Sequence, residues 1–168
     1  YAAFTEYAGG GVIGANEFGN GKEGWYFSQR DSRWAGQYIG YSNYTVYEVG
    51  CLITSVAMVH KSYGIDTNPS KIAGNPDNFW YRTAYMLIPW PAPSGKSYTA
   101  ISTSKIDDEL EDRPVIVGVY AGPYGTHFVV LSEKDDGDYV MYDPYYGPDL
   151  DFSEYYSKSS IFQAVVFK

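Results

Sequence analysis

The chain has 168 residues, which is the usual size of a single domain. Its 12 Lys and Arg against 20 Asp and Glu give a net charge of -8, which opposes the phosphate contacts on which nucleic-acid binding depends. No apolar run approaches the ~20 residues that a membrane-spanning helix needs. We therefore expect a soluble, packed protein with no nucleic-acid partner and no membrane span in this chain.

Residues 1–24 are rich in glycine and show no helical or strand period. We predict that they form an N-terminal arm or linker and that residues 25–168 form one domain. Gly9, Gly11 and Gly14 have the GxGxxG spacing of a nucleotide-binding loop, but no strand precedes them and no convincing helix follows, which argues against such a site. Because the sequence starts with tyrosine rather than methionine, we also expect it to be part of a longer precursor.

Helical patterns follow in three places. From residue 51 onward, apolar residues recur every three or four positions until Gly64, a glycine typical of a helix end: Leu52, Val56, Val59 and Tyr63. Asn68, followed by proline, marks the start of a short helix over 68–73, and a third helix is expected over 103–112. Residues 25–48 mix aromatic and turn-forming residues, which predicts short strands and loops instead.

The C-terminal half is rich in β-branched and aromatic residues. Four runs, separated by Gly, Pro and Asp, are predicted to be strands: 115–120, 127–133, 138–143 and 161–167. The sequence KDDGD between the middle two predicts a hairpin turn at Gly137. Helices in the first half followed by an antiparallel sheet describe an α+β domain.

Cys51 is the only cysteine, so an internal disulfide is excluded. The predicted helix starts at this residue, and the positive end of a helix dipole favours a thiolate. Three interpretations are open: a buried inert thiol, a bridge to another chain, or a nucleophile. A free cysteine is most often a small buried apolar residue, so a nucleophile requires a base nearby.

The chain has two histidines that could serve as this base. His60 lies on the same helix about 13 Å from Cys51, at 1.5 Å per residue, and is expected to be structural. His127 opens a predicted strand and Asp143 ends the next one, so the hairpin brings the two within about two to four residues of each other. Asp143 could then orient the imidazole, although a histidine at a strand end can be structural and an aspartate before proline often forms a turn.

Four segments, in order, carry a resemblance to a known family: FSQRDSRWAGQYIG, VGCLITSVAMVHKSYG, RPVIVGVYAGPYGTHFVVL and YVMYDPYYG. Over residues 26–168 the chain resembles bacterial cysteine peptidase family thirty-nine. The resemblance implies a papain-like α+β fold, with N-terminal helices, the nucleophile at a helix start and a C-terminal antiparallel sheet. It also implies four roles: Cys51 as the nucleophile, His127 as the general base and acid, Asp143 as the residue that orients His127, and Gln29 as the side-chain donor of the oxyanion hole.

The function that the resemblance implies is thiol-dependent hydrolysis of peptide or amide bonds, without a metal or cofactor. Peptide or peptidoglycan-type substrates, a monomeric state and an extracellular or cell-surface location are expected on the same basis. Gln37 stays a rival oxyanion donor because the segment between Gln29 and Cys51 is long. The same residues could instead transfer an acyl group or deamidate, and the 19 tyrosines would also suit a non-catalytic module that binds peptides or glycans.

Overall fold

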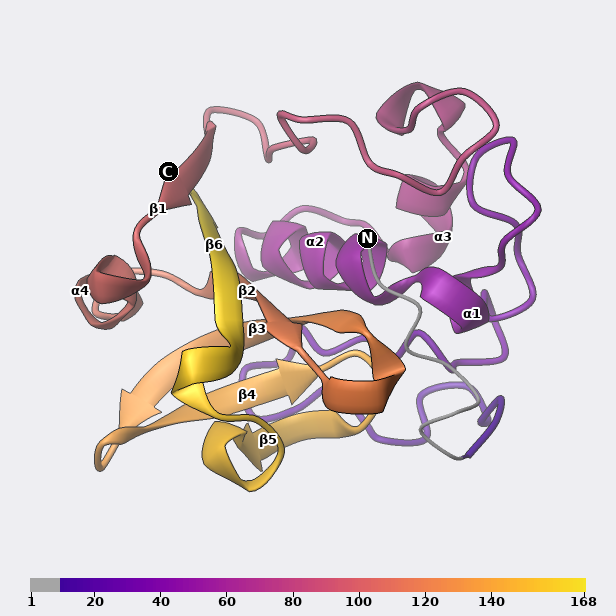
Figure 1. The fold of residues 1–168 in the computed structure, drawn as a ribbon. Helices are drawn as coiled ribbons and strands as arrows, with labels where there is room; N and C mark the ends of the chain where they lie inside the picture. The colour runs from indigo at the N-terminus through magenta and orange to yellow at the C-terminus, as the bar shows by residue number, and fades with distance from the viewer. Residues whose placement is uncertain (1–9) are drawn as a thin grey trace.

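In the computed structural model, which describes residues 10–168, helices from the first half of the chain lie against a six-stranded sheet built by the second half (Figure 1). All strand pairs in the sheet are antiparallel. The α+β class predicted from the sequence is therefore confirmed. None of the helices within the described residues is long and apolar enough to cross a membrane.

The strands follow the order β1-β6-β2-β3-β4-β5 across the sheet. Their bounds are Tyr98–Ile101 (β1), Val115–Tyr120 (β2), Thr126–Asp135 (β3), Asp138–Asp143 (β4), Gly147–Asp151 (β5) and Ile161–Phe167 (β6). The four predicted strands are β2, β3, β4 and β6, and Gly137 turns the β3–β4 hairpin with a φ of 82°. The edge strands β1 and β5 are not apparent in the sequence. Most residues of β5, whose sequence is GPDLD, are of types that are rare in strands, so this strand depends on pairing with β4.

Three predicted helices are present, with changed bounds. Helix α2 spans Cys51–Ser62 and so begins at the expected residue. Helix α3 spans Pro69–Ala73, where the Asn68 side chain accepts a hydrogen bond from the Lys71 N–H as its cap. The helix expected over 103–112 is a 3-10 turn followed by a short α-helix, namely η3 (Thr103–Lys105) and α4 (Ile106–Leu110). Further 3-10 turns are η2 (Pro76–Asn78), η4 (Gly122–Tyr124), η5 (Phe152–Glu154) and η6 (Lys158–Ser160).

A short helix, α1, covers Val46–Val49, where the sequence pattern predicts only strands and loops, so that prediction is wrong here. Thr45 and Glu48 form a capping box: the Glu48 N–H donates to Thr45 Oγ1 at 3.2 Å, and the Thr45 N–H donates to Glu48 Oε1 at 3.1 Å. Four residues are too few to show an apolar helical period. Because α1 leads through Gly50 into α2, its cap helps to fix the approach to Cys51.

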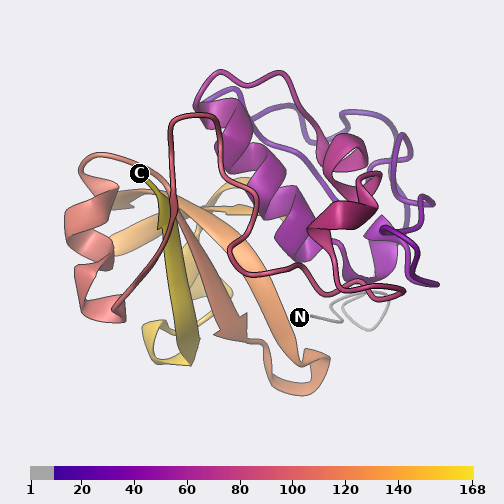
Figure 2. The same ribbon diagram turned by 90° about the horizontal axis from the view of Figure 1, so that it is seen from above.

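The sheet separates two apolar cores, one on each face. Helices α2 and α4 lie on opposite sides of the sheet (Figure 2). On one face α2 packs mainly on β3, with Val56 beside Phe128 in the same cluster. On the other face α4 contributes Ile106 and Leu110. The burial of α2 between the sheet and the N-terminal loops holds its first turn against the sheet, and this arrangement positions Cys51.

Residues 10–24 belong to the predicted arm, and the remainder of that arm, residues 1–9, lies outside the described residues. The Ile13 N–H donates to the Arg30 carbonyl oxygen at 2.9 Å, and Arg30 Nε donates to the Gly11 carbonyl oxygen at 2.8 Å. The Arg30 guanidinium also lies 4.8 Å from the centre of the Tyr145 ring. These contacts tie residues 10–24 to the rest of the chain, and the domain boundary at residue 25 stays a prediction.

Position 50, between α1 and α2, requires glycine because the backbone of Val46 lies very close to it. A Cβ at this position would meet the carbonyl oxygen of Val46 and would lie 2.8 Å from Val46 Cα. Both are backbone atoms, so they cannot turn away as the end of a side chain can. A side chain at residue 50 must therefore shift the junction between α1 and α2, and Cys51 with it.

We predict that Gly50→Ala lowers the free energy of unfolding by about 1–3 kcal/mol, measured by urea denaturation. Gly36→Ala is the matched control, because a Cβ at Gly36 meets no atom within 4 Å. That control should change stability by no more than ~0.5 kcal/mol. Equal effects of the two substitutions would contradict the steric role of Gly50.

Candidate active site

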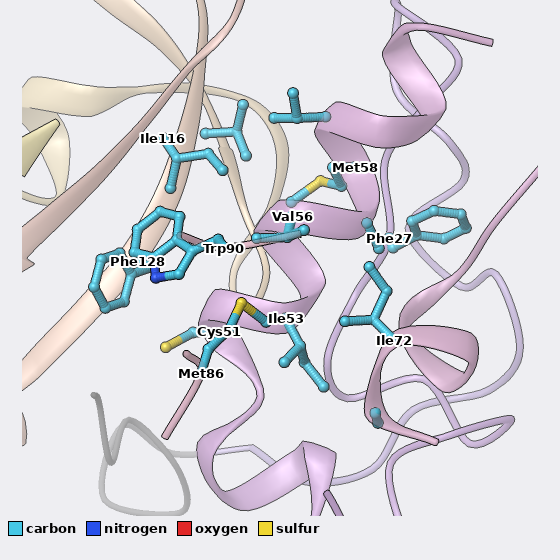
Figure 3. Packing of buried hydrophobic residues seen from close by; sticks show 14 of the residues in the cluster. Phe27, Cys51, Ile53, Val56, Met58, Ile72, Met86, Trp90, Ile116 and Phe128 are labelled. Carbon is cyan, nitrogen blue, oxygen red and sulfur yellow. The ribbon is translucent and has the colours of Figure 1, made fainter. Parts of the chain in front are cut away.

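Cys51 is the first residue of α2 and is fully buried. At this position the positive end of the helix dipole favours a negative charge on its sulfur. Cys51 shares a buried cluster with Met86, Trp90 and Phe128, on the side of α2 that faces the sheet (Figure 3). The thiol therefore presents no surface to solvent in this structure.

His127 and Asp143 are brought together by the β3–β4 hairpin. The strands pair Val130 with Tyr142, so Asp143, at the end of β4, lies close to His127, the second residue of β3. His127 Nε2 lies 2.8 Å from Asp143 Oδ1, and both side chains are fully buried. The carboxylate can only accept, so Nε2 carries the proton and donates it to Asp143. The proximity expected from the sequence is therefore observed.

The Asp143 carboxylate accepts several hydrogen bonds besides the one from His127. Oδ1 also accepts from the backbone N–H groups of Tyr145 at 2.7 Å and Tyr146 at 3.2 Å. Oδ2 accepts from the Tyr156 hydroxyl at 2.8 Å. A buried charge is costly unless its lone pairs are satisfied, and these four donors satisfy them. The carboxylate is thus held in one orientation toward the imidazole.

The side chain of Cys51 also interacts with the His127 imidazole, and this interaction raises the pKa of His127. Burial, the largest single influence, lowers the pKa of His127, but the charge of Asp143, the hydrogen bond to it and the interactions with Cys51 outweigh burial and raise the pKa to about 9. At neutral pH the ring is therefore protonated and positively charged.

The two candidate oxyanion donors occupy different surroundings. Gln29 is fully buried, and its Nε2 donates to the carbonyl oxygen of Tyr47, in α1, at 3.0 Å. Its Oε1 is buried without a hydrogen-bond partner among the described residues. By contrast, both atoms of the Gln37 amide bond Ser70 on α3: Nε2 donates to the carbonyl oxygen at 3.0 Å, and Oε1 accepts from the hydroxyl at 2.7 Å. The structure thus places Gln29 beside the helix that leads to Cys51, and ties Gln37 to α3.

Gln29 and the residues just before it are joined by hydrogen bonds to the carbonyl oxygens of Asp143 and Pro144. The Gln29 N–H donates to the Pro144 carbonyl oxygen at 2.8 Å, and the Ser28 hydroxyl donates to the same oxygen at 3.1 Å. The Tyr26 hydroxyl donates to the Asp143 carbonyl oxygen at 2.6 Å. Residues that are more than 100 positions apart in the chain are thereby fixed relative to one another.

Tyr156 is a site residue that the sequence does not indicate. It follows β5 and η5, and no spacing rule relates it to Asp143. Burial, the charge of Asp143 and the hydrogen bond to it all raise the pKa of Tyr156, so its hydroxyl stays protonated and keeps donating to Oδ2. Only the folded chain shows this contact.

His60, the other histidine, has a different role. Its Nε2 lies 2.8 Å from the Pro91 carbonyl oxygen, and its ring packs edge-on against Phe167. Burial lowers the pKa of His60 more than this hydrogen bond raises it. The structural role expected for His60 agrees with these contacts. Among the described residues no group of three or more His, Cys, Asp or Glu side chains could hold a metal ion.

The Peptidase_C39 like family model matches residues 25–164, which is most of the chain. The chain belongs to this family. A structure described as that of a candidate C39-like peptidase from Bacillus anthracis is similar at 17% sequence identity, with a TM-score of 0.48, and the match covers 71% of this chain and 88% of that one. No curated protein matches the sequence.

Membership of the C39-like peptidase family confirms the resemblance seen in the sequence and supports cysteine peptidase chemistry at the level of the family. The buried arrangement of Cys51, His127 and Asp143 contains the groups that such chemistry needs: a sulfur, a base beside it and an acceptor that orients the base. The roles of the individual residues are proposals.

The pairing of Cys51 with His127 predicts a substrate-independent difference in thiol reactivity. At pH 6, iodoacetamide should alkylate Cys51 at least about tenfold faster in the unaltered protein than in His127→Ala, because only in the former can an imidazolium stabilise the reactive anion of a thiol. The rate is measured by mass spectrometry of the intact protein.

His60→Ala is the matched control, since it removes the other histidine and leaves the pair intact. Its alkylation rate should equal that of the unaltered protein. Equal rates in all three proteins, or a thiol that reacts only after the protein is unfolded in urea, would contradict the pairing.

Proposed function

We propose that the chain hydrolyses peptide or amide bonds with the thiolate of Cys51 as its nucleophile. The observation that carries the proposal is the single imidazole of His127, which bonds Asp143 through Nε2 at 2.8 Å and interacts with the Cys51 thiol. An imidazole between a thiol and a carboxylate is the arrangement that activates a cysteine for attack on a carbonyl. The family assignment supports the same chemistry.

The proposed reaction has two stages. The Cys51 sulfur attacks the substrate carbonyl carbon, a C–S bond forms and the carbonyl oxygen becomes an oxyanion. The His127 imidazolium gives its proton to the amine nitrogen, the C–N bond breaks, and the amine leaves behind an acyl-thioester. His127 then takes a proton from water, which attacks the thioester carbon and releases the acid and the free thiolate. No metal or cofactor takes part in these steps.

The oxyanion needs donors on the side of the carbonyl away from the imidazole. We assign Gln29 and the backbone N–H of Cys51 to this role. An amide nitrogen carries two hydrogens, and Gln29 uses one of them for the Tyr47 carbonyl oxygen, so the other can be donated to an oxyanion. Two or more such donors, held in place before the reaction, lower the barrier to acyl transfer.

Three outcomes of the same chemistry differ in the bond that is attacked or in the molecule that accepts the acyl group. Hydrolysis uses water, acyl transfer uses an amine or alcohol, and deamidation attacks a side-chain amide instead of a peptide bond. All three pass through the same acyl-thioester, so the residues present support each of them equally. An extracellular or cell-surface location stays a prediction.

The direct test is conversion of substrates by the unaltered protein and by Cys51→Ala. A panel of peptides, glutamine-containing peptides and cell-wall peptides is incubated with each protein, and products are read by mass spectrometry. The proposal expects cleaved or deamidated products with the unaltered protein alone. Products formed equally by both proteins would contradict a thiol mechanism, and a panel without products would favour a binding module.

Gln29 offers a test of transition-state stabilisation. Gln29→Ala should lower kcat by about 10² to 10³, because the donor acts only when negative charge develops on the oxygen. KM should change little, and alkylation of Cys51 by iodoacetamide, which forms no oxyanion, should keep its rate. Gln37→Ala is the matched control and should retain kcat. A selective kcat loss in Gln37→Ala, with Gln29→Ala active, would move the oxyanion role to Gln37.

A further inference from the structure

A largely apolar cavity of about 380 Å³ lies beside the candidate nucleophile. Val49 and Leu52, on either side of Cys51 in the chain, both line it. Phe128, the residue after His127, lines it from the sheet. The cavity is therefore lined by chain neighbours of both Cys51 and His127, while these two residues themselves lie buried behind its wall.

The floor of the cavity consists of buried apolar side chains. Met86, Trp90 and Phe128 are each less than a tenth exposed and belong to the same buried cluster as Cys51 (Figure 3). The Trp90 and Phe128 rings meet edge to face, with centres 5.7 Å apart. Aromatic pairs with this geometry stabilise each other beyond the burial of their surface, and here they form a large apolar wall.

The rim of the cavity consists of large apolar side chains that are open to solvent. Trp80 is 63% exposed, Tyr85 is 49% exposed and Ile88 is 69% exposed. They belong to one segment of the chain, which follows η2 and precedes β1. Neighbouring exposed apolar groups at the mouth of a cavity mark a surface that binds a ligand.

The chemistry of the walls restricts what can enter. Within residues 10–168, no Asp, Glu, Lys or Arg lines the cavity, and the polar side chains that do are Gln163 and Tyr85. A charged group inside would lose its hydration without gaining an ion-pair partner. A small side chain such as that of alanine would leave most of the apolar wall uncovered. A large uncharged apolar side chain loses no such hydration and covers the apolar wall.

We propose that this cavity binds a large apolar or aromatic side chain of a peptide, close to the bond that Cys51 attacks. The proposal rests on the proposed function and narrows its substrate class to peptides that carry such residues. It disfavours peptidoglycan stem peptides, which consist of alanine, glutamate and a diamino acid. The volume is at the lower end of the range of ~300–1,000 Å³ found for ligand sites, which suits one side chain with its adjoining backbone.

The test uses peptidyl chloromethyl ketones, in which the Cys51 sulfur displaces chloride, so that a C–S bond forms as the C–Cl bond breaks. Probes in each pair differ only in having Phe or Gly at one position near the reactive carbon. At one position the Phe probe should label Cys51 at least ~100-fold faster than the Gly probe, measured as the second-order rate by mass spectrometry. A probe with the stem-peptide sequence should be as slow as the Gly probe.

A pair of surface variants tests whether the cavity causes the preference. Trp80→Ala should slow labelling by the Phe probe at least ~5-fold and leave the Gly probe unchanged, because removing an apolar group from the wall of a pocket weakens binding by roughly 10-fold or more. Tyr81→Ala is the matched control, since Tyr81 is a neighbouring aromatic residue that is 73% exposed and does not line the cavity. It should leave both rates unchanged.

Each outcome decides one question. Equal labelling by the Phe and Gly probes at every position, or fastest labelling by the stem-peptide probe, overturns the proposed cavity while the thiol chemistry stands. If no probe labels Cys51, the proposed function fails. The cavity is then tested by calorimetry with unreactive Phe and Gly peptides and Cys51→Ala: tighter binding of the Phe peptide supports it, and equal or no binding overturns it.

Discussion

The buried carboxylate of Asp143 is the constraint on which the site depends. A carboxylate with no exposed surface is stable only when donors satisfy both of its oxygens, and here the donors are His127, two backbone N–H groups and the Tyr156 hydroxyl. Burial lowers the pKa of His127 and would by itself keep the imidazole neutral. The negative charge of Asp143 opposes this effect. Without Asp143, the imidazole of His127 would lose both its orientation and the largest influence that raises its pKa.

The same turn organises the rest of the site. The carbonyl oxygens of Asp143 and Pro144 accept hydrogen bonds from Tyr26, Ser28 and the Gln29 backbone, so the candidate oxyanion donor and the candidate base share one set of contacts. Cys51 comes from a third region, α2, which packs against β3 through the apolar core. The site therefore lies where the helical half of the chain meets the sheet, and the apolar cavity occupies the same junction.

The sequence predicts the parts of this arrangement that depend on local pattern. Periodicity places the start of α2 at Cys51, and the hairpin length brings His127 near Asp143, as the structure shows. The helix α1 is missed because four residues show no period, and β5 because its residues disfavour strands until β4 pairs with them. The Tyr156 contact has no local signal at all. The choice between Gln29 and Gln37 also needs the folded chain, which ties Gln37 to Ser70.

Protonation of His127 at neutral pH depends on the charge of Asp143 and the hydrogen bond to it, which together with the Cys51 interactions outweigh the burial of the ring. Nitrogen NMR of the two histidine rings across a pH series measures this directly, with His60 as an internal reference. We expect His127 to titrate at about 9 and His60 below 6.5, and we expect Asp143→Asn to move the pKa of His127 downward. A His127 ring that loses its proton at or below pH ~6.5 in the unaltered protein, the ordinary value for histidine, would contradict this role of Asp143.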